Sequence, residues 1–244
     1  ILHGDLGTSL YNNLPVMENI RNSLEPTILI MIFSILISVV VGIPVGVISA
    51  VHRNSILDYL LMTVSVFGLS IPVFWSGIML AYYVGTLWGV LPNMYYYPIS
   101  QVGLGQAIQY VILPSVALGF QSVASIARYT RSTMLDTLGE DYIRTARAKG
   151  LAERVVLYQH ALKNAMSPVI THIGTNMASL MGGACVIETV FGINGMGKLA
   201  YDSLIRRDYT QVQAIILVVA LVYIVINLVV DILYKVFDPR VELS

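Results

Sequence analysis

Charged side chains are scarce in this sequence of 244 residues. Only 11% of the residues are charged, whereas 56% are hydrophobic and the mean hydropathy is +0.74. In a soluble domain about a quarter of the residues are charged. This composition therefore excludes a soluble domain and indicates an integral membrane protein. The fourteen basic and fourteen acidic residues cancel to a formal net charge of zero, which gives no electrostatic support for nucleic-acid binding.

Cysteine is limited to Cys185, and the histidines are dispersed. One cysteine excludes an intrachain disulfide and a cysteine-based zinc site. His3, His52, His160 and His172 form no helical metal-binding pair. No nucleophile and base, and no ligand set, face one another at membrane depth. The sequence therefore predicts no catalytic residue, no metal site and no cofactor on this chain, and it disfavours an intramembrane enzyme.

Apolar stretches define the expected architecture, since a bilayer core needs about twenty apolar residues per helix. Five stretches qualify: Thr27–Ala50, Leu60–Trp88, Tyr110–Ala127, Met166–Ile187 and Val212–Leu233. Ten loop arginines and lysines then fall on one side and four on the other, which predicts a cytoplasmic C-terminus. We expect an all-α, polytopic bundle forming one transmembrane domain over 1–244.

The same topology places residues 1–26 outside the cell as an outer segment. They contain no apolar stretch that could have carried them across the membrane as a signal peptide. We therefore expect a preceding span in a longer protein. The segments 133–165 and 191–211 become a cytoplasmic loop and an outer loop.

Charge is nearly absent inside the spans. A charge at mid-membrane costs about 2.5 to 3.5 kcal/mol and usually marks a proton or ion path. Asp231 lies near an inner end with Lys235 one turn later, which suits a helix ion pair. Glu188 lies at an outer end, where a salt bridge or a cap is favoured over a substrate contact. Proton- or sodium-driven transport is therefore disfavoured, and the energy should come from elsewhere.

Prolines, glycines and polar side chains within the spans indicate helix packing. Pro44, Pro72 and Pro114 predict kinks. Two glycine pairs predict close helix approach: Gly42 with Gly46, and Gly182 with Gly183. Four polar or soft side chains are candidates for the pathway, although such residues more often serve helix packing than substrate contact: Ser70, Asn176, Met177 and Met181. The sequence does not rank them.

A glycine-rich run after the fourth span imitates a phosphate-binding loop. Residues 192–199 reproduce its glycines and lysine, but Leu199 replaces the Ser or Thr that would hold magnesium. The run also follows a membrane span on the outer side. We interpret it as a tight turn.

Seven of the fourteen basic residues lie between Arg128 and Lys163. Within this stretch we predict a helix over Leu135–Lys149, with Leu138, Tyr142 and Ala146 on one face. Gly150 should end it, a second helix should follow over Glu153–Asn164, and Pro168 should begin the next span. On charge alone, a site for a partner protein and an amphipathic hairpin on anionic lipid are equally supported.

The order of residues in this stretch resembles the cytoplasmic loop of ATP-binding-cassette (ABC) importer permeases. Arg-Thr-Ala-Arg-Ala-Lys-Gly at 144–150, followed by His160 to Ala165, is similar to the loop of the branch that imports dipeptides, oligopeptides and nickel. A second similarity covers 186–197, where Asn194 stands in place of the usual proline. The resemblance extends from Gly4 to Arg240.

The resemblance implies a fold of the type I ABC importer permease kind and a set of partners. These are a homologous second permease, two cytoplasmic ATPases that hold ATP and Mg, an external solute-binding protein and membrane lipid. The location implied is a bacterial or archaeal inner membrane. For the substrate, the resemblance implies di- or oligopeptides first, with nickel chelates, glutathione and oligosaccharides as alternatives. A non-transporting assembly subunit is a further alternative for the function of the chain.

By the same resemblance, the loop around Gly150 is a coupling helix. The residues expected to serve ATPase coupling are Tyr142, Arg144, Thr145, Ala146, Arg147, Ala148, Lys149, Gly150, Leu151, His160 and Leu162. Within it, Ala146 and Ala148 should allow close approach to an ATPase, and Arg144, Arg147 and Lys149 should pair with its acids or carbonyls. The outer-loop signature comprises Glu188, Phe191, Gly195, Gly197 and Asp208.

Overall fold

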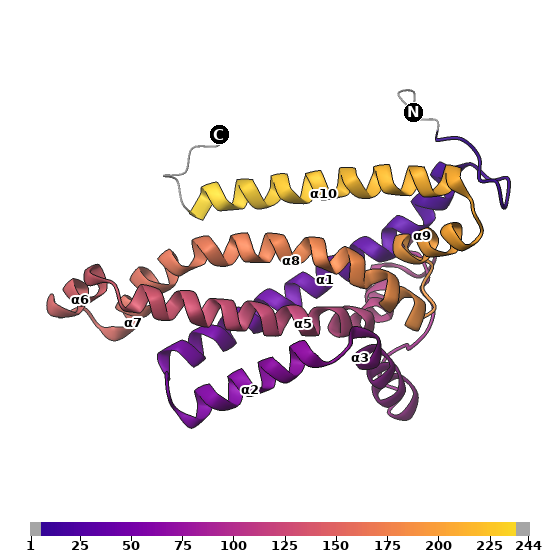
Figure 1. The fold of residues 1–244 in the computed structure, drawn as a ribbon. Coiled ribbons are helices and arrows are strands. Elements are labelled where there is room, and N and C mark those ends of the chain that lie inside the picture. Colours follow the sequence, from indigo (N-terminus) through magenta and orange to yellow (C-terminus); the bar gives the residue numbers. More distant parts are fainter. Residues whose placement is uncertain (1–5, 238–244) are drawn as a thin grey trace. The chain divides into compact units, whose positions relative to one another are not determined.

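The computed structural model describes residues 6–237, apart from the side chains at 178–179, 230–231 and 233–237. Helices make up most of this chain (Figure 1). The predicted all-α class is therefore confirmed for the described residues. The expected Asp231–Lys235 pair lies outside the described side chains.

Twelve elements follow one another along the described chain, and Figure 1 labels most of the α-helices; η denotes a π-helix. They are α1 (Val16–Val51), α2 (Ile56–Ser70), α3 (Val73–Leu80), η1 (Ala81–Leu87), α4 (Ile99–Val102), α5 (Leu104–Leu138), α6 (Asp141–Ala148), α7 (Glu153–Val155), η2 (Val156–Leu162), α8 (Lys163–Val190), α9 (Met196–Ile205) and α10 (Tyr209–Phe237).

Three helices of the described chain are long and apolar enough to cross a membrane: α1, α5 and the Tyr209–Val229 part of α10. The bent pair Ile56–Ser70 and Val73–Leu87 makes a fourth if it counts as one span. In α8, which runs without a break through the predicted Met166–Ile187 span, the apolar part that qualifies is the shorter Leu180–Val190. By length and composition the described residues thus give three or four spans, whereas we predicted five.

The predicted span Leu60–Trp88 is divided at Pro72, where the sequence predicts a kink, and its two parts are bent by 100°. Helix α2 ends at Ser70, and Pro72 is the extended residue that precedes α3. Proline lacks the N–H that a helix needs and pushes the residue before it out of the helical region, so the helix is interrupted here. Pro168, by contrast, lies inside α8, which already begins at Lys163. The predicted start at Pro168 is therefore wrong.

The chain forms two compact units. Unit 1 comprises the residues up to Ile35, Ile71–Gly119 and Met177–Val225, and unit 2 comprises Leu36–Ser70, Phe120–Asn176 and the residues from Ile226 on. In unit 1, Phe191, Ile30 and Val111 belong to a buried apolar cluster drawn from α1, α5, α8 and the segment after α8. In unit 2, a second cluster lies beneath α6.

Close helix approach in unit 2 depends on two glycines of α1. A Cβ on Gly46 would lie 2.5 Å from the Ala127 carbonyl oxygen and 2.6 Å from Thr130 Cβ, and one on Gly42 would lie 3.0 Å from the Val123 oxygen. These two positions confirm the predicted helix contact. In the second pair, Gly183 lies against Leu118, whereas Gly182 has no neighbour within 4 Å among the described residues. The described residues thus show close packing at Gly183 and none at Gly182.

Gly46→Ala should therefore destabilise the protein, because its methyl group would meet backbone that cannot move aside. We expect a loss of about 1 to 3 kcal/mol, typical of overpacking. Gly182→Ala is the matched control in open space, and it should be neutral or gain up to about 1 kcal/mol of helix propensity. Thermal unfolding in detergent should give a lower midpoint for Gly46→Ala than for the parent, and an unchanged or higher midpoint for Gly182→Ala. Equal losses at both sites would contradict the packing argument.

Candidate functional site

The segment between α5 and α8 contains the short helices α6 and α7 and the π-helix η2, and their bounds differ from the two helices predicted from the sequence. The predicted helix Leu135–Lys149 is wrong, because α5 ends at Leu138 and α6 begins at Asp141. Tight bonds from the Gly139 N–H to the Asp136 oxygen (3.1 Å) and from the Glu140 N–H to the Thr137 oxygen (3.2 Å) end α5. Leu138 therefore belongs to a different helix from Tyr142 and Ala146.

The second predicted helix, Glu153–Asn164, is divided as well. Its first turn is α7, its middle is the π-helix η2, and its last residues already belong to α8. Residues 139–162 are called the α6–η2 segment below (Figure 1).

Gly150 ends α6 in the way the sequence predicted. Its φ is +76°, a left-handed conformation that costs a residue with a Cβ about 1 to 2 kcal/mol. The Gly150 N–H donates to the Arg147 oxygen (2.9 Å), and the Leu151 N–H donates to the Ala146 oxygen (3.4 Å). This pair of bonds is the Schellman arrangement, which satisfies the last carbonyls of a helix and reverses the chain.

The inner face of α6 is fixed by apolar contacts. Ile143 is fully buried and Ala146 is 6% exposed, and both belong to a cluster with Val156, Ala161 and Met134. Burying a side chain such as Ile143 contributes about 1.5 to 3 kcal/mol. The prediction that Ala146 approaches a partner's surface is wrong, since its small side chain packs inside unit 2 instead. The sequence analysis also missed Ile143.

An ion pair closes the turn around Gly150. Arg147 Nη2 and Nε donate to Glu153 at 2.7 and 3.2 Å. The hydrogen bond from Arg147 lowers the pKa of Glu153 below its ordinary value. Both side chains are about half exposed, so the pair adds little stability. Arg147 thus has a partner within the chain, and its pairing with an ATPase stays a prediction.

The other predicted residues fall into two groups. Those on the solvent-exposed side of the segment are Tyr142, Arg144, Thr145, Ala148, Lys149 and Leu151. His160 is half-buried, and its carbonyl accepts the Asn164 side-chain amide at 2.7 Å. Leu162 packs against the cluster beneath α6. The exposed group leaves one continuous stretch of α6 and its C-terminal turn available for contact.

An ion pair in unit 2 was not found by the sequence analysis. Asp58 in α2 is 1% exposed and accepts two bonds of 2.7 Å from Arg131 in α5. It also accepts bonds from the Ser49 hydroxyl and from the Asn54 N–H, the latter at 3.0 Å. These bonds join the end of α1, the start of α2 and the C-terminal part of α5. The two ionised residues lie 73 positions apart, so no local pattern reveals the pair.

In unit 1, Glu188 caps the start of α9. Its carboxyl group is fully buried, accepting the Lys198 N–H at 2.8 Å and the Thr27 hydroxyl at 2.5 Å. Thr27 in turn accepts the Met196 N–H at 2.8 Å. A carboxylate is favourable at a helix N-terminus because unpaired N–H groups converge there. Of the roles considered for Glu188, which were a salt bridge, a helix cap and a substrate contact, the structure shows the helix cap.

The signature glycines leave room for this carboxylate. A Cβ on Gly195 would overlap the Glu188 carboxyl group and lie 2.6 Å from Thr27 Oγ1. A Cβ on Gly197 would lie 2.6 Å from Cys185 Cα. Phe191, which is 1% exposed, anchors the same turn in the unit 1 cluster. Four of the five predicted signature residues therefore build one buried corner.

Asp208, the fifth signature residue, holds a different junction. It caps α10 through the Gln211 N–H (3.2 Å) and also accepts bonds from the Ser9 hydroxyl and the Leu10 N–H. Burial alone would raise its pKa, but these hydrogen bonds outweigh burial and lower the pKa below its ordinary value. Asp208 thereby fixes residues 8–10 to the start of α10.

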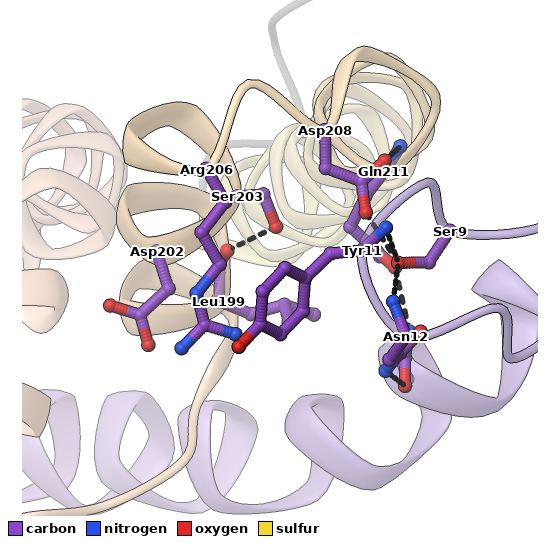
Figure 2. Close-up of a pocket in the computed structure, with 10 residues that line it drawn as sticks. Ser9, Tyr11, Asn12, Leu199, Asp202, Ser203, Arg206, Asp208 and Gln211 are labelled. Carbon is purple, nitrogen blue, oxygen red and sulfur yellow. Dashed lines mark hydrogen bonds between the residues drawn. The ribbon is translucent and has the colours of Figure 1, made fainter.

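A cavity of about 70 Å³ adjoins this junction. Figure 2 draws the residues that line it. Arg206 and Tyr11 both line the cavity, and the Arg206 guanidinium lies over the Tyr11 ring, 4.0 Å from the ring centre. The Gln211 side chain accepts a bond from Asn19 (2.9 Å), but its buried Nε2 has no hydrogen-bond partner among the described residues. The cavity is large enough for ordered water.

Comparison with known proteins assigns these features to one family. Residues 42–243 match the family described as binding-protein-dependent transport system inner membrane component. The chain belongs to this family. It is thus an ABC transporter permease and a multi-pass protein of the inner membrane.

Curated relatives cover nearly the whole chain. The dipeptide transport system permease protein DppB of Alkalihalophilus pseudofirmus is 42% identical, over 98% of this chain and 78% of the relative. The oligopeptide transport system permease protein AppB of Bacillus subtilis is 41% identical, over 99% and 77%. The glutathione transport system permease protein GsiC of Salmonella typhimurium is 42% identical, over 99% and 76%.

A solved structure supports the fold independently. A chain of the MetNI methionine ABC transporter, in an inward-facing conformation, superposes on the permease with a TM-score of 0.73. The match covers 91% of this chain and 97% of that one at 18% identity. The predicted fold of an ABC importer permease is therefore confirmed.

The corner around Glu188 gives a stability prediction for the permease. Gly195→Ala should lower stability by about 1 to 3 kcal/mol, because its methyl group would displace the buried carboxylate from α9. Gly105→Ala is the control, because Gly105 lies in the same unit and a Cβ there would have no neighbour within 4 Å among the described residues. Its unfolding midpoint should change little. Fluorescence-detected thermal unfolding in detergent measures both. A Gly195→Ala midpoint equal to that of the control would show that the corner is loosely packed.

Asp208 predicts a pH dependence. Its folded pKa lies below the ordinary value of 3.8, so its contribution is complete above that value and is lost as the pH falls through the folded pKa. Asp208→Asn should lower the unfolding midpoint at pH 7 and flatten the decline below about pH 4. Asp202→Asn, at the same cavity, is the control. A parent and an Asp208→Asn variant with parallel pH profiles would refute the role of Asp208.

Proposed function

We propose that this permease forms half of the pathway of an ATP-driven importer for di- and oligopeptides. The observation that carries the proposal is the identity of about 40% to dipeptide and oligopeptide permeases over nearly the whole chain. The glutathione permease at similar identity also carries a small peptide by name. These relatives favour peptides over nickel chelates or oligosaccharides.

The proposed complex contains a second, homologous permease, two cytoplasmic ATPases and an external solute-binding protein. ATP and Mg belong to the ATPases, and this chain holds no cofactor. In the proposed orientation the C-terminus and the α6–η2 segment are cytoplasmic, since ten of the fourteen basic residues fall on that side. The corner around Glu188 then faces outward, toward the binding protein.

The α6–η2 segment is the proposed contact with an ATPase. A segment that transmits a push must resist deformation, because nucleotide can shift the permease only through contacts that differ between two states. The Gly150 turn, the Ile143 cluster and the Arg147–Glu153 pair each restrict this segment. The exposed side chains of Tyr142, Arg144, Thr145, Ala148, Lys149 and Leu151 would make the contact.

Burial of the apolar face of α6 also favours this contact over an amphipathic hairpin on lipid. A helix that binds a membrane surface inserts its apolar face into the bilayer. In α6 that face, Ile143 and Ala146, is already buried in unit 2. The outward side carries Arg144 and Lys149 and only Tyr142 and Leu151 as large apolar groups.

Reconstitution of the complex tests the proposal. Proteoliposomes with both permeases, both ATPases and the binding protein should accumulate a labelled dipeptide only with ATP inside the cytoplasmic compartment. ATP hydrolysis should rise when the peptide-loaded binding protein is added. A non-transporting assembly subunit would leave hydrolysis and uptake unaffected by this chain, and uptake of nickel chelate or oligosaccharide without peptide would reject the substrate class.

Gly150 provides an isosteric pair of variants for the coupling role. Asn and Asp both tolerate left-handed backbone better than other residues with a Cβ, so Gly150→Asn and Gly150→Asp perturb the turn alike. Asp also places a negative charge between Lys149 and the contacting surface. We expect Gly150→Asp to abolish uptake while Gly150→Asn retains a large part of it, with equal membrane insertion. Parental transport by the Asp variant would overturn the coupling assignment.

A further inference from the structure

One face of α5 is polar although the helix is apolar enough to cross a membrane. Ser125, Arg128, Tyr129 and Ser132 follow one another at the spacing of a single helix face. Apart from Ser125, these residues lie just beyond the predicted span Tyr110–Ala127, at the end of α5 that is proposed to be cytoplasmic. A polar face in such a place can line a water-filled cavity on the pathway of a substrate. This face therefore calls for a functional explanation.

The face lines a cavity in unit 2. Ser125, Arg128, Tyr129 and Ser132 surround it with Leu69 from α2 and His172 from α8. Its volume is about 370 Å³, within the range of about 300 to 1,000 Å³ usual for small-molecule sites.

Part of the cavity wall is held in place by contacts between its own side chains. The His172 ring stacks on Tyr129 with ring centres 4.2 Å apart and planes 13° apart. His172 Nε2 and Ser125 Oγ lie 2.9 Å apart. These contacts fix the two rings and one hydroxyl before any ligand enters, which reduces the ordering that binding requires.

Arg128 differs from the arginine three residues later. Arg131 is neutralised by Asp58, whereas no carboxylate among the described residues pairs with Arg128, and none lines the cavity. Ser132 likewise has no hydrogen-bond partner in the described part of the chain. The cavity thus presents a positive charge and a free hydroxyl without a compensating acid.

We propose that this cavity binds the terminal carboxylate of a peptide during its passage. A planar guanidinium donates two parallel bonds to a carboxylate, and Ser132 can donate a third. A terminal carboxylate is the one anionic group that di- and oligopeptides of every sequence share. This assignment rests on the proposed function, and it adds a residue-level site to a pathway that the sequence did not resolve.

Protection of an introduced thiol tests the site directly. The complete complex is prepared in phosphatidylcholine nanodiscs with Cys185→Ala and Leu69→Cys, so that a water-soluble maleimide reports on the cavity while Arg128 and Ser132 stay in place. Dialanine should slow labelling, whereas dialanine amide, which lacks the carboxylate, should not. Arg128→Gln should weaken protection about tenfold, the loss of a hydrogen-bonded charge pair. Arg53→Gln, which removes an exposed charge elsewhere in unit 2, should leave it intact.

Three results would overturn the site. One is equal protection by the acid and the amide, and another is no protection by either. The third is Arg128-dependent slowing by added phosphatidylglycerol without any effect of dialanine, which would identify a lipid phosphate as the ligand. The acid-to-amide contrast needs no arginine variant, so it decides the matter even if Arg128→Gln fails to assemble. Uptake of dialanine by the parent complex separates the outcomes: uptake without protection rejects the cavity alone, and no uptake rejects the proposed function.

Discussion

Buried carboxylates must be fully hydrogen-bonded, and this constraint organises both units of the permease. Asp58, Glu188 and Asp208 are each at most 2% exposed. A buried ionised group without partners would cost many kcal/mol, so each acid draws donors from segments that are distant in the chain. Asp58 joins α1, α2 and α5, Glu188 joins α1, α8 and α9, and Asp208 joins residues 8–10 to α10. In a chain with so few charges, these three acids hold the ends of the long helices.

The sequence predicted those parts of the structure that depend on local chemistry. Gly150 has the left-handed turn expected of it, and Glu188 caps a helix as favoured. The sequence did not reveal the Asp58–Arg131 pair or the inward direction of Ala146, because both depend on contacts between segments far apart in the chain. The sequence predicted one helix across Gly139 and only a kink at Pro72, whereas the helix is interrupted at both positions. Helix-favouring or apolar residues continue on both sides of each break, so the sequence does not mark the interruption. The cavity at Arg128 escaped notice for the first reason, since His172 lies 47 positions from Ser125.

The basic stretch that dominates the sequence does not act as one surface. Arg131 neutralises a buried acid, Arg147 closes a turn, and Arg128 lines a cavity. Only Arg144 and Lys149 remain on the exposed side of α6, and Arg144 has no more than a 3.5 Å contact with exposed Asp141. The positive charge of this region is thus divided among several local roles. The proposed contact with an ATPase would then depend on the shape of α6 as much as on its charge.

A carboxylate site in the permease agrees with a division of labour in recognition. A pathway that serves peptides of many sequences cannot depend on side-chain contacts, because a strong contact to one peptide would be absent or unfavourable for another. It can depend on the terminal carboxylate, which is common to all. A single arginine that has no paired acid among the described residues would bind that group without holding it as a buried ion pair would, since Arg128 and Ser132 are exposed. Binding of this moderate kind allows release, which transport requires as much as capture.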